Sequence, residues 1–415
     1  MVFRFAHLAD IHLGGYRDPK LKKLTVDAFE IAIEKIIQSD IDYVLISGDL
    51  FNTPLPGIDF LNDCVKNLKK LKKQNIPVYV IAGSHDFSLS GKTILNVLES
   101  ADLILKTNNA KVVEDGESQK ILFDPMIDAK TNSLIIGVSG KKGSYDKDVY
   151  QFLDTSNLNL DEFFSIFMFH NGINEMLPSN MDFDSLSVSD LPKGFDYYAG
   201  GHIHYTEEKE NPRIVFPGST FPENFRELEK FKKGFFKIVE VSDDKKINTE
   251  LIEIHTKKVV SFSFDLDGLN PFKSTSLMID EIKKRKDELN DSIVLIRAKG
   301  VLDGRTTNID FRKVLTLIND YGAYVTLRNT SKLRSENIEM VDICDQLPVK
   351  EMENEVISQN FSDEKIPVLS KYSDYKRQLN MMVDVLSNEK NDDEKKKDYL
   401  KRVINEVDFL FGNLV

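Results

Sequence analysis

The chain has 415 residues, of which 41% are hydrophobic and 29% charged, so it is long enough for two or three domains with separate cores. Its net charge of −12 excludes a surface coated with nucleic-acid-binding charge, although one local basic face remains compatible with it. Cys64 and Cys344 lie far apart and exclude a disulfide framework, a zinc finger and an iron–sulfur site. No apolar run reaches the roughly 18 residues that span a membrane. Arg4, His7 and Asp10 interrupt the apolar N-terminus, so we expect no signal peptide and a cytoplasmic protein.

Residues 1–255 alternate strand and helix patterns. Three apolar runs predict strands at 2–9, 43–46 and 77–81. Apolar residues at three-to-four spacing predict a helix in each of the two intervals between them. This order predicts a parallel sheet with right-handed crossovers. Later runs are more closely spaced and predict hairpins and a second sheet, with strands at 134–138, 163–169, 195–199, 213–216 and 234–241.

Residues 256–335 predict a smaller α/β unit. Its expected strands are 259–266, 293–298 and 325–327, and its expected helices are 280–288 and 311–321. Between residues 257 and 334 there are 15 Lys and Arg against 10 Asp and Glu, which makes this the net-basic part of the chain. Residues 336–415 contain no strand pattern, but two amphipathic helices are predicted near 375–386 and 400–411, with a charged linker between them.

Histidines and aspartates gather directly after the predicted strands. Five of the seven histidines of the chain have this position. The residues are, in chain order, Asp10 and His12, Asp49, His85 with Asp86, His170, and His202 with His204. Because residues just past the carboxyl ends of strands converge on one crevice of an α/β sheet, we expect them to lie together. The other two histidines are interpreted differently, His7 as a structural residue within a strand and His255 as a surface residue.

Mixed imidazole and carboxylate ligands suit manganese, zinc or iron. Each motif alone has a less specific explanation, since Gly-Asp after a strand is usually a turn and a Gly-x-His-x-His can be a solvated loop. Together the candidates are numerous enough for two metals bridged by one carboxylate. Two metals about 3.5–4 Å apart clamp the attacking and leaving oxygens of a phosphoryl displacement.

The ordered series DIH, GDLF, GSHD, FHNG and GHIH resembles the motifs of the calcineurin-like metallophosphoesterases. The segment PGSTFPENFRELEKFKKGFFKIVE, the small basic unit and the helical C-terminus further resemble the Mre-eleven/SbcD-like family of DNA double-strand-break repair nucleases. The resemblance implies an α/β fold with a two-sheet metallophosphoesterase sandwich at 1–255. It also implies a small α/β capping and DNA-binding domain at 256–335, and a linker with a helical partner-binding segment at 336–415.

The same resemblance implies two Mn²⁺ ions per chain and a role for each motif residue. Asp10, His12 and His204 match the ligands of the first metal, and Asp49 matches the bridging carboxylate. His170 and His202 match ligands of the second metal, to which the residue at position 84 also belongs. His85 matches the catalytic histidine that faces the scissile phosphate without binding metal. Asp86 would then fix the orientation and tautomer of the His85 imidazole.

Two positions depart from the family pattern. The third motif normally reads Gly-Asn-His, with the Asn oxygen on the second metal, whereas this chain has Ser84. The shorter hydroxyl predicts weaker binding of the second ion, or a water in the gap. Many members also carry a histidine after Gly-Asp-x-Phe where this chain has Asn52, which bears on exonuclease efficiency but not on the metal site.

Three functions remain in competition. The first is a Mn²⁺-dependent exonuclease and endonuclease that acts on DNA ends. The second is a phosphatase or small-substrate phosphodiesterase, for which the C-terminal extension of the chain is unnecessary. The third is a non-catalytic DNA-end scaffold whose second metal site is weakened by Ser84.

The resemblance implies three partners: double-stranded DNA ends, a second copy of the chain in a homodimer formed near the first helices, and a coiled-coil ABC-type ATPase of the Rad-fifty/SbcC type. The candidate DNA contacts are the basic side chains Lys257, Lys258, Arg297, Lys299, Arg305, Arg328, Lys332 and Arg334. The candidate ATPase contacts are the apolar stripes Tyr375, Leu379, Met382, Val383 and Leu386, and Leu400, Val403, Ile404, Val407 and Leu410. The alternative for these stripes is that the two helices pack against each other.

Overall fold

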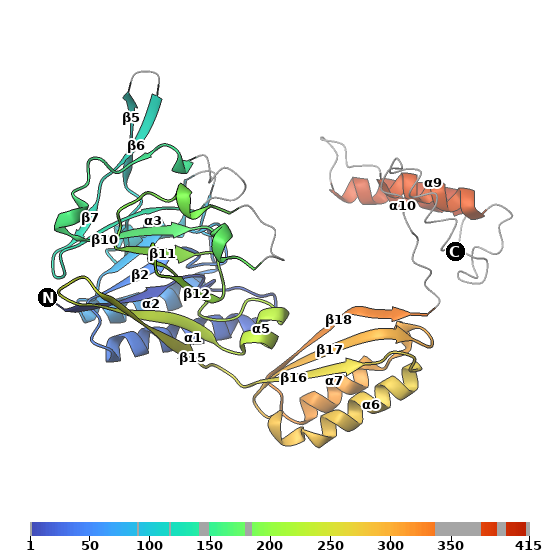
Figure 1. Ribbon diagram of the computed structural model, residues 1–415. Coiled ribbons are helices and arrows are strands. Elements are labelled where there is room, and N and C mark those ends of the chain that lie inside the picture. The colour runs from blue at the N-terminus through green and yellow to red at the C-terminus, as the bar shows by residue number, and fades with distance from the viewer. Residues whose placement is uncertain are drawn as a thin grey trace. The chain divides into compact units, whose positions relative to one another are not determined.

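The computed structural model of the chain (Figure 1) describes residues 2–88, 91–115, 118–140, 149–178, 185–336, 375–387 and 396–411. The chain divides into two compact units. The first comprises Met1–Ser263, Glu281–Arg297 and Leu315–Asn329, and the second comprises Phe264–Asp280, Ala298–Val314 and Thr330–Val415. The domain boundaries near 255 and 335 stay predictions.

The first sheet contains the predicted parallel strands. Its order is β15-β14-β1-β2-β3-β4. The strands are β1 (Phe3–Leu8), β2 (Tyr43–Ser47), β3 (Val78–Ile81), β4 (Leu105–Lys106), β14 (Gly234–Val241) and β15 (Ile247–Ile254). β1 to β4 pair in parallel, whereas β14 runs antiparallel to both β1 and β15. The connecting helices are α1 (Pro19–Gln38), α2 (Ile58–Lys73) and α3 (Ile94–Ser100).

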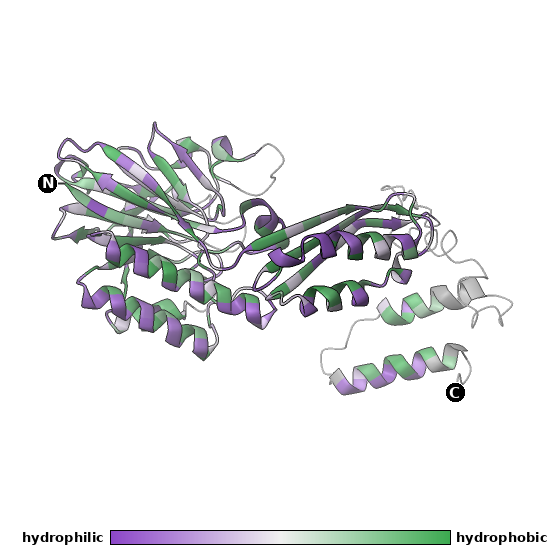
Figure 2. Cartoon of the chain, turned by 90° about the horizontal axis from the view of Figure 1, so that it is seen from below, coloured by the Kyte–Doolittle hydropathy of each residue, from purple (hydrophilic) through white to green (hydrophobic). Residues whose placement is uncertain are grey.

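Helix α1 begins where its sequence predicts a start. Asp18 is the N-cap, and its carboxylate accepts hydrogen bonds from the backbone N–H groups of Lys20 and Leu21 at 2.8 and 3.4 Å. Pro19 follows at the first helical position, where its missing N–H costs nothing. Hydrophobic and hydrophilic residues alternate in stripes along α1 and α2 (Figure 2), and the apolar stripe of α1, including Phe29 and Ile33, is buried in the core that covers the first sheet.

The second sheet has the order β12-β13-β11-β10-β8-β7. Its strands are β7 (Met126–Asp128), β8 (Ser133–Val138), β10 (Phe164–His170), β11 (Tyr197–Gly201), β12 (Thr206–Lys209) and β13 (Ile214–Pro217). A second sheet was predicted, but the prediction of hairpins is wrong for its centre, where β8, β10, β11 and β13 are parallel. The connection between β10 and β11 contains the short 3-10 helices Asn174–Met176 and Val188–Asp190 in its described parts, which give no long amphipathic pattern that would signal a crossover.

The strand at 234–241 also differs from expectation. It returns as β14 to the first sheet, where it pairs with β1 in the register Phe5 opposite Val239. The inner faces of the two sheets pack against each other through a shared aromatic core. The Phe5 ring stacks on Tyr43 of its own sheet at 5.1 Å and meets Tyr197 of the second sheet edge-on at 5.2 Å. This confirms the two-sheet sandwich.

A small third sheet joins β5 (Ala110–Asp115), β6 (Ser118–Phe123) and β9 (Leu153–Asp154). A fourth joins β16 (Val259–Asp265), β17 (Ile293–Leu302) and β18 (Val325–Ser335), and α6 (Pro271–Lys284) and α7 (Phe311–Asp320) lie along one of its faces (Figure 1). Helix α6 begins at Pro271, earlier than predicted, because the Asn270 side chain accepts a hydrogen bond from the Lys273 N–H at 2.9 Å. Asn followed by Pro is a start signal that the periodicity argument did not use.

Helices α9 (Tyr375–Ser387) and α10 (Lys396–Phe411) lie side by side (Figure 1). Packing of the two helices against each other was the alternative to a partner-binding surface. Met382, Val383, Val403 and Val407 are half-buried, whereas Leu386, Leu400 and Ile404 remain exposed. The side chains of Tyr375, Leu379 and Leu410 lie outside the described residues. None of the helices in the described part of the chain has the length and apolar character needed to cross a membrane.

Candidate metal centre

The predicted site residues lie where the strands of the two sheets end. Asp10 and His12 follow β1, Asp49 follows β2, and His85 follows β3. In the second sheet His170 is the last residue of β10, and the His202 motif follows β11. Since β1, β2 and β3 run parallel to one another, as do β10 and β11, their carboxyl ends bring these side chains to one edge of the sandwich.

The backbone at this edge adopts an unusual conformation. Asp10, His12, Asp49 and His202 have φ angles of 52°, 46°, 52° and 83°, in a region that residues other than glycine seldom occupy. Hydrogen bonds hold it there, because the N–H groups of Ile11 and His12 both donate to the Asp49 carbonyl at 2.9 Å. Strained backbone of this kind concentrates at functional sites.

Two glycines let the sheets approach closely at the site. Gly48 has a φ of 90°, and a Cβ atom there would lie 2.2 Å from Nδ1 of His170. A Cβ atom on Gly201 would lie 1.9 Å from the carbonyl oxygen of Ser47, across the gap between the sheets. Glycine is therefore required at these two positions for a steric reason. Any side chain there would push apart the two sheets that supply the potential metal ligands.

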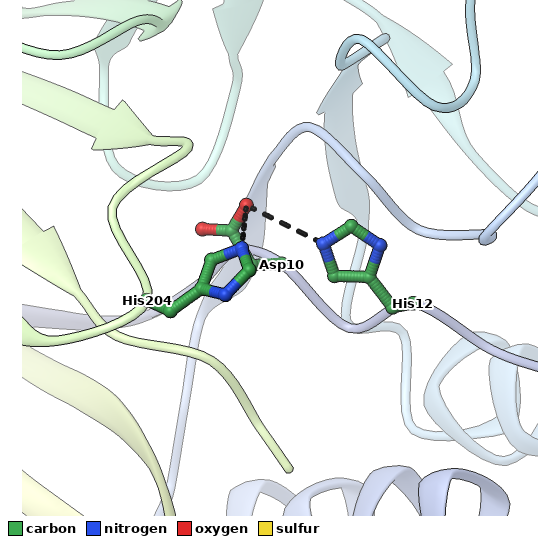
Figure 3. A group of neighbouring side chains, drawn as sticks. All are labelled: Asp10, His12 and His204. Carbon is green, nitrogen blue, oxygen red and sulfur yellow. Dashed lines mark ion pairs between the residues drawn. The ribbon is translucent and has the colours of Figure 1, made fainter. Parts of the chain in front are cut away.

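The first group of potential ligands is Asp10, His12 and His204, whose ligand atoms all lie within 4.8 Å of one another. Figure 3 shows both imidazoles directed at the same oxygen of the Asp10 carboxylate, with each Nε2 atom 3.9 Å from Oδ1. Both oxygens of Asp10 also accept the His202 N–H, at 3.1 and 3.0 Å. The structure therefore brings together the residues expected at the first metal.

A second group joins Asp10, Asp49 and His170. Nε2 of His170 lies 3.1 Å from Oδ2 of Asp49, while its Nδ1 lies 2.8 Å from the carbonyl of Ser47. A carbonyl can only accept, so Nδ1 carries the proton and Nε2 faces the carboxylate with its lone pair when the ring is neutral. The same Asp49 oxygen is 3.6 Å from Nε2 of His12, which places Asp49 between the two groups.

Two residues expected at the second metal lie at its margin. The His202 ring is 5.3 Å from the His170 ring, but His202 is not part of any of the three tight groups found among the described residues. The Ser84 hydroxyl donates to Oδ2 of Asp49 at 3.5 Å, at the long limit for a hydrogen bond. In this half of the site, His202 and Ser84 lie farther from the other potential ligands than the members of the first group lie from one another.

His85 is exposed and its ring lies 4.8 Å from the His12 ring. Its backbone N–H donates to Asp49 at 2.7 Å, and a third tight group contains His85 with His12 and Asp49. The predicted role of Asp86 is wrong. Its buried carboxylate accepts the backbone N–H groups of Leu50, Phe51 and Gly83, whereas Nδ1 of His85 lies 3.0 Å from the carbonyl of Asn52. Asp86 therefore holds the loops of Leu50, Phe51 and Gly83 together and does not orient the His85 imidazole.

The electrostatics of the site fit a divalent cation. Nε2 of His12 is buried without a hydrogen-bond partner among the described residues, and it faces the carboxylates of Asp10 and Asp49. Burial opposes the charged form of His170, but Asp49 and Asp10 outweigh it and raise its pKa to about 9. Burial, followed by His170, lowers the pKa of His202 to about 4, so this imidazole is neutral at neutral pH. Packed carboxylates and imidazoles of this kind are stabilised by a bound cation.

Sequence reasoning missed Glu223 and Glu227. Oε1 of Glu223 lies 2.8 Å from Nδ1 of His12, and Oε1 of Glu227 lies 3.1 Å from Nδ1 of His204. Glu227 stands three residues after Asn224, the N-cap of α5 (Phe225–Phe231), in a capping-box spacing. The spacing could have located the helix start, but not the histidines beside it. These carboxylates fix the tautomers of two potential ligands, a common arrangement around metal sites.

The remaining predicted residues differ in their surroundings. Ion pairs hold half of the candidate DNA contacts, joining Lys257 to Asp291, Lys258 to Glu288, Arg297 to Glu229 and Lys299 to Asp265 at 2.6, 3.5, 2.7 and 3.2 Å. The other four, Arg305, Arg328, Lys332 and Arg334, are exposed. His7 is fully buried between the hydroxyls of Tyr197 and Ser47, and His255 is exposed, as their interpretations required.

Comparisons with known proteins agree with this geometry. Residues 3–206 match the family model of the calcineurin-like phosphoesterases, so the sandwich and its carboxylate–imidazole cluster form a metallophosphoesterase domain. The chain is 27% identical to the DNA double-strand break repair protein Mre11 of Methanococcus maripaludis over 87% of its own length and 92% of that protein. It is 29% identical to the Mre11 protein of Methanocaldococcus jannaschii over 71% of its length and 81% of that protein.

A solved dimetal phosphatase from Danio rerio aligns with 61% of the chain and 98% of its own, at 11% identity and a TM-score of 0.36. The Mre11 proteins match beyond the phosphoesterase domain, whose family model ends at residue 206. The family model and the archaeal Mre11 proteins therefore agree with the resemblance seen in the motifs of the chain.

Proposed function

We propose that this chain is a metal-dependent DNA nuclease that hydrolyses phosphodiester bonds at DNA ends during double-strand-break repair. The observation that carries the proposal is the position of Asp49, whose carboxylate lies 3.1 Å from His170 and 3.6 Å from His12, between two groups of potential ligands. The names of the Mre11 relatives supply the substrate class, DNA with double-strand breaks.

Two Mn²⁺ ions per chain are the proposed cofactors. Asp10, His12 and His204 would hold the first, and His170, His202 and the Ser84 position would hold the second, with Asp49 shared between them. Such a pair of ions polarises the phosphate and supplies the attacking water when bound. Glu223 and Glu227 keep His12 and His204 in the tautomer whose Nε2 lone pair faces Asp10.

His85 is the proposed general acid. Its imidazole is exposed at the edge of the cluster, and the Asn52 carbonyl accepts from Nδ1 at 3.0 Å, so Nε2 is the nitrogen that remains directed away from the loop. In the doubly protonated ring, Nε2 can donate its proton to the leaving oxygen of the DNA strand, which leaves the neutral imidazole with Nδ1 still bonded to Asn52, or it can stabilise the charge that develops on the phosphate.

DNA would contact the proposed capping domain, residues 256–335, mainly through phosphates. Arg305, Arg328, Lys332 and Arg334 are candidate contacts because all four side chains are exposed. Binding through phosphates predicts an affinity that falls steeply as salt concentration rises. The proposal would be wrong if affinity for duplex DNA were insensitive to salt.

The coiled-coil ABC-type ATPase remains the proposed partner of residues 336–415. Leu386, Leu400 and Ile404 stay exposed although α9 and α10 pack together, so an apolar surface is left for a helix of the partner. Removal of residues 370–415 should abolish co-purification with the ATPase and spare Mn²⁺-dependent cleavage of a small phosphodiester. Homodimerisation near the first helices is the remaining proposal, supported by Leu55 and Ile58, which are 74% and 80% exposed before and at the start of α2.

One assay separates the three candidate functions. Purified protein with Mn²⁺ is incubated with linear duplex, hairpin DNA and a small phosphodiester, alongside Asp49→Asn and the matched surface variant Asp59→Asn. A nuclease cleaves DNA, and loses this activity in Asp49→Asn but not in Asp59→Asn. A small-substrate phosphodiesterase cleaves only the small ester, and a scaffold binds DNA without cleaving any substrate.

A further inference from the structure

The orientation of the His170 imidazole depends on one backbone carbonyl, that of Ser47, the last residue of β2. The carbonyl oxygen accepts a hydrogen bond from Nδ1 of His170 at 2.8 Å, and Nε2 of the same ring then faces Oδ2 of Asp49 at 3.1 Å. Outer partners of this kind fix the tautomer and the orientation of a metal-binding imidazole. A shift of Ser47 would therefore turn a proposed ligand of the second metal away from its place.

Ser47 lies where the regular backbone pairing of β2 ends. Pairing with β1 ends one residue earlier, at Leu8 opposite Ile46, and pairing with β3 ends at Ser47 opposite Ile81. The chain then turns at Gly48, whose φ is 90°. The ends of strands open more readily than their centres, so a side-chain contact at Ser47 adds to the precision with which its carbonyl is held.

This contact comes from His7 in the neighbouring strand β1. Nε2 of His7 lies 2.9 Å from Oγ of Ser47, and Nδ1 lies 3.0 Å from the hydroxyl of Tyr197 in β11 of the second sheet. Serine and tyrosine hydroxyls can each donate or accept, so both ring nitrogens have partners whichever of them carries the proton. One imidazole therefore joins three strands, each of which leads to potential metal ligands.

Burial makes this link a rigid one. The side chains of His7, Ser47 and Tyr197 are all fully buried. In the interior a hydrogen bond is stronger than in water, and a group that loses its partner stays unsatisfied. Ring contacts restrict the imidazole further, since Tyr197 meets His7 edge-on at 5.8 Å and Phe5 edge-on at 5.2 Å. Loss of the His7 imidazole would leave the Ser47 hydroxyl without this partner, in the same residue whose carbonyl holds His170.

We propose that His7 is a positioning residue for the second metal, because through Ser47 it keeps the His170 imidazole directed at Asp49. His7 acts through the end of β2 and is not itself a ligand. The first metal would not depend on this link, because two glutamates beside α5 hold the histidines of that group. The inference rests on the proposed two-ion nuclease and adds a residue of the core between the sheets to its second site.

Four variants separate positioning from general stability. His7→Phe keeps a ring but removes both hydrogen bonds, whereas His7→Gln keeps an oxygen and a nitrogen for the two hydroxyls. Ser47→Ala removes the Oγ contact and leaves the carbonyl. The matched control is Tyr43→Phe, which removes another buried hydrogen bond between the two sheets. That bond joins Tyr43, at the opposite end of β2, to Ser133 of β8 at 3.1 Å.

Calorimetric titration with Mn²⁺ measures the two ions separately. In His7→Phe and in Ser47→Ala the second ion should bind about tenfold more weakly, at the lower end of the effect of losing an outer partner, and the first ion should bind as before. His7→Gln should recover most of the affinity, and Tyr43→Phe should keep all of it. His7→Phe/Ser47→Ala should lose no more than either single variant, because both changes remove the same bond.

A second measurement needs no metal. In isotope-labelled protein with chelator present, the buried Nδ1–H of His170 should give a downfield proton resonance, assigned by its absence in His170→Gln. In His7→Phe this proton should exchange with solvent about tenfold faster, because the strand end that protects it opens more often. In Tyr43→Phe the exchange rate should be unchanged.

The outcomes distinguish this proposal from the proposed function. If two ions bind and DNA is cleaved, but His7→Phe matches Tyr43→Phe in Mn²⁺ affinity and in exchange, the role of His7 is wrong and the nuclease stands. If the unaltered protein binds a single ion, the two-ion proposal is wrong, and the exchange of the His170 proton still decides the role of His7. If His7→Phe does not fold, Ser47→Ala/Tyr197→Phe takes its place, and unchanged exchange there counts equally against positioning.

Discussion

The buried imidazole of His7 should make the stability of the protein fall in acid. Burial, and secondly the charge of Lys237, lowers the pKa of His7 from 6.5 to about 3 in the folded chain. In the unfolded chain the ring is exposed and takes up a proton below its ordinary pKa. Between the pKa of the folded chain and that of the unfolded chain, His7 is protonated only in the unfolded state. The free energy of unfolding therefore decreases as the pH falls through this range.

The size of this effect follows from the two pKa values. At pH 5 the linkage relation gives a loss of about 2 kcal/mol relative to neutral pH, and the full loss below pH 3 approaches about 5 kcal/mol. His7→Gln removes the titration but keeps a side chain that can both donate and accept. This matters because the two ring nitrogens face the hydroxyls of Tyr197 and Ser47 at 3.0 and 2.9 Å.

The assay is urea unfolding at pH 7 and pH 5, with chelator present so that metal binding does not contribute. The loss of stability between the two pH values should be about 2 kcal/mol smaller in His7→Gln than in the unaltered protein. His255→Gln, which replaces an exposed imidazole, is the control and should keep the original pH dependence. If the unaltered protein and His7→Gln lost equal stability between pH 7 and pH 5, the loss would not come from His7, because all other titrating groups are common to both proteins.

Three further predictions concern the metal centre. His85→Ala should lose turnover by about 10²- to 10⁴-fold and keep its metal content, measured by elemental analysis; lost metal would instead make His85 a ligand. Glu223→Gln should weaken calorimetric Mn²⁺ affinity by about 10- to 100-fold, with Glu253→Gln, an exposed carboxylate, as the unaffected control. Ser84→Asn should move the Mn²⁺ dependence of cleavage to lower concentration, because an amide oxygen reaches farther than the hydroxyl now 3.5 Å from Asp49; identical titrations would contradict this.

The part of the site that follows strand ends could be predicted from the sequence. Asp10, Asp49 and His170 were found because a buried strand stops and a polar side chain follows, and parallel pairing then determines where that side chain lies. Glu223 could not be found in this way. Its contact with His12 spans two distant segments, and its position depends on how α5 packs rather than on any local pattern.

The errors have the same origin. Asp86 follows His85 in the chain, yet its carboxylate accepts the N–H groups of Leu50 and Phe51 while Nδ1 of His85 donates to the Asn52 carbonyl, so adjacency misled the assignment. The strand at 234–241 was placed in the second sheet because it follows other strands closely, but its pairing with β1 is set by tertiary contacts. Local periodicity identified most of the strands and left their neighbours undetermined.

The pairing of β1 with β14 also bears on the order in which the chain can fold. β1 leaves the ribosome before the antiparallel neighbour that covers its free edge, Gly234–Val241, which is synthesised more than two hundred residues later. Until then β1 is an unprotected edge strand, and the loop that carries Asp10 and His12 extends from it. A contact of such long sequence separation closes slowly. Metal-binding competence should therefore appear late in synthesis, after β14 has joined the first sheet.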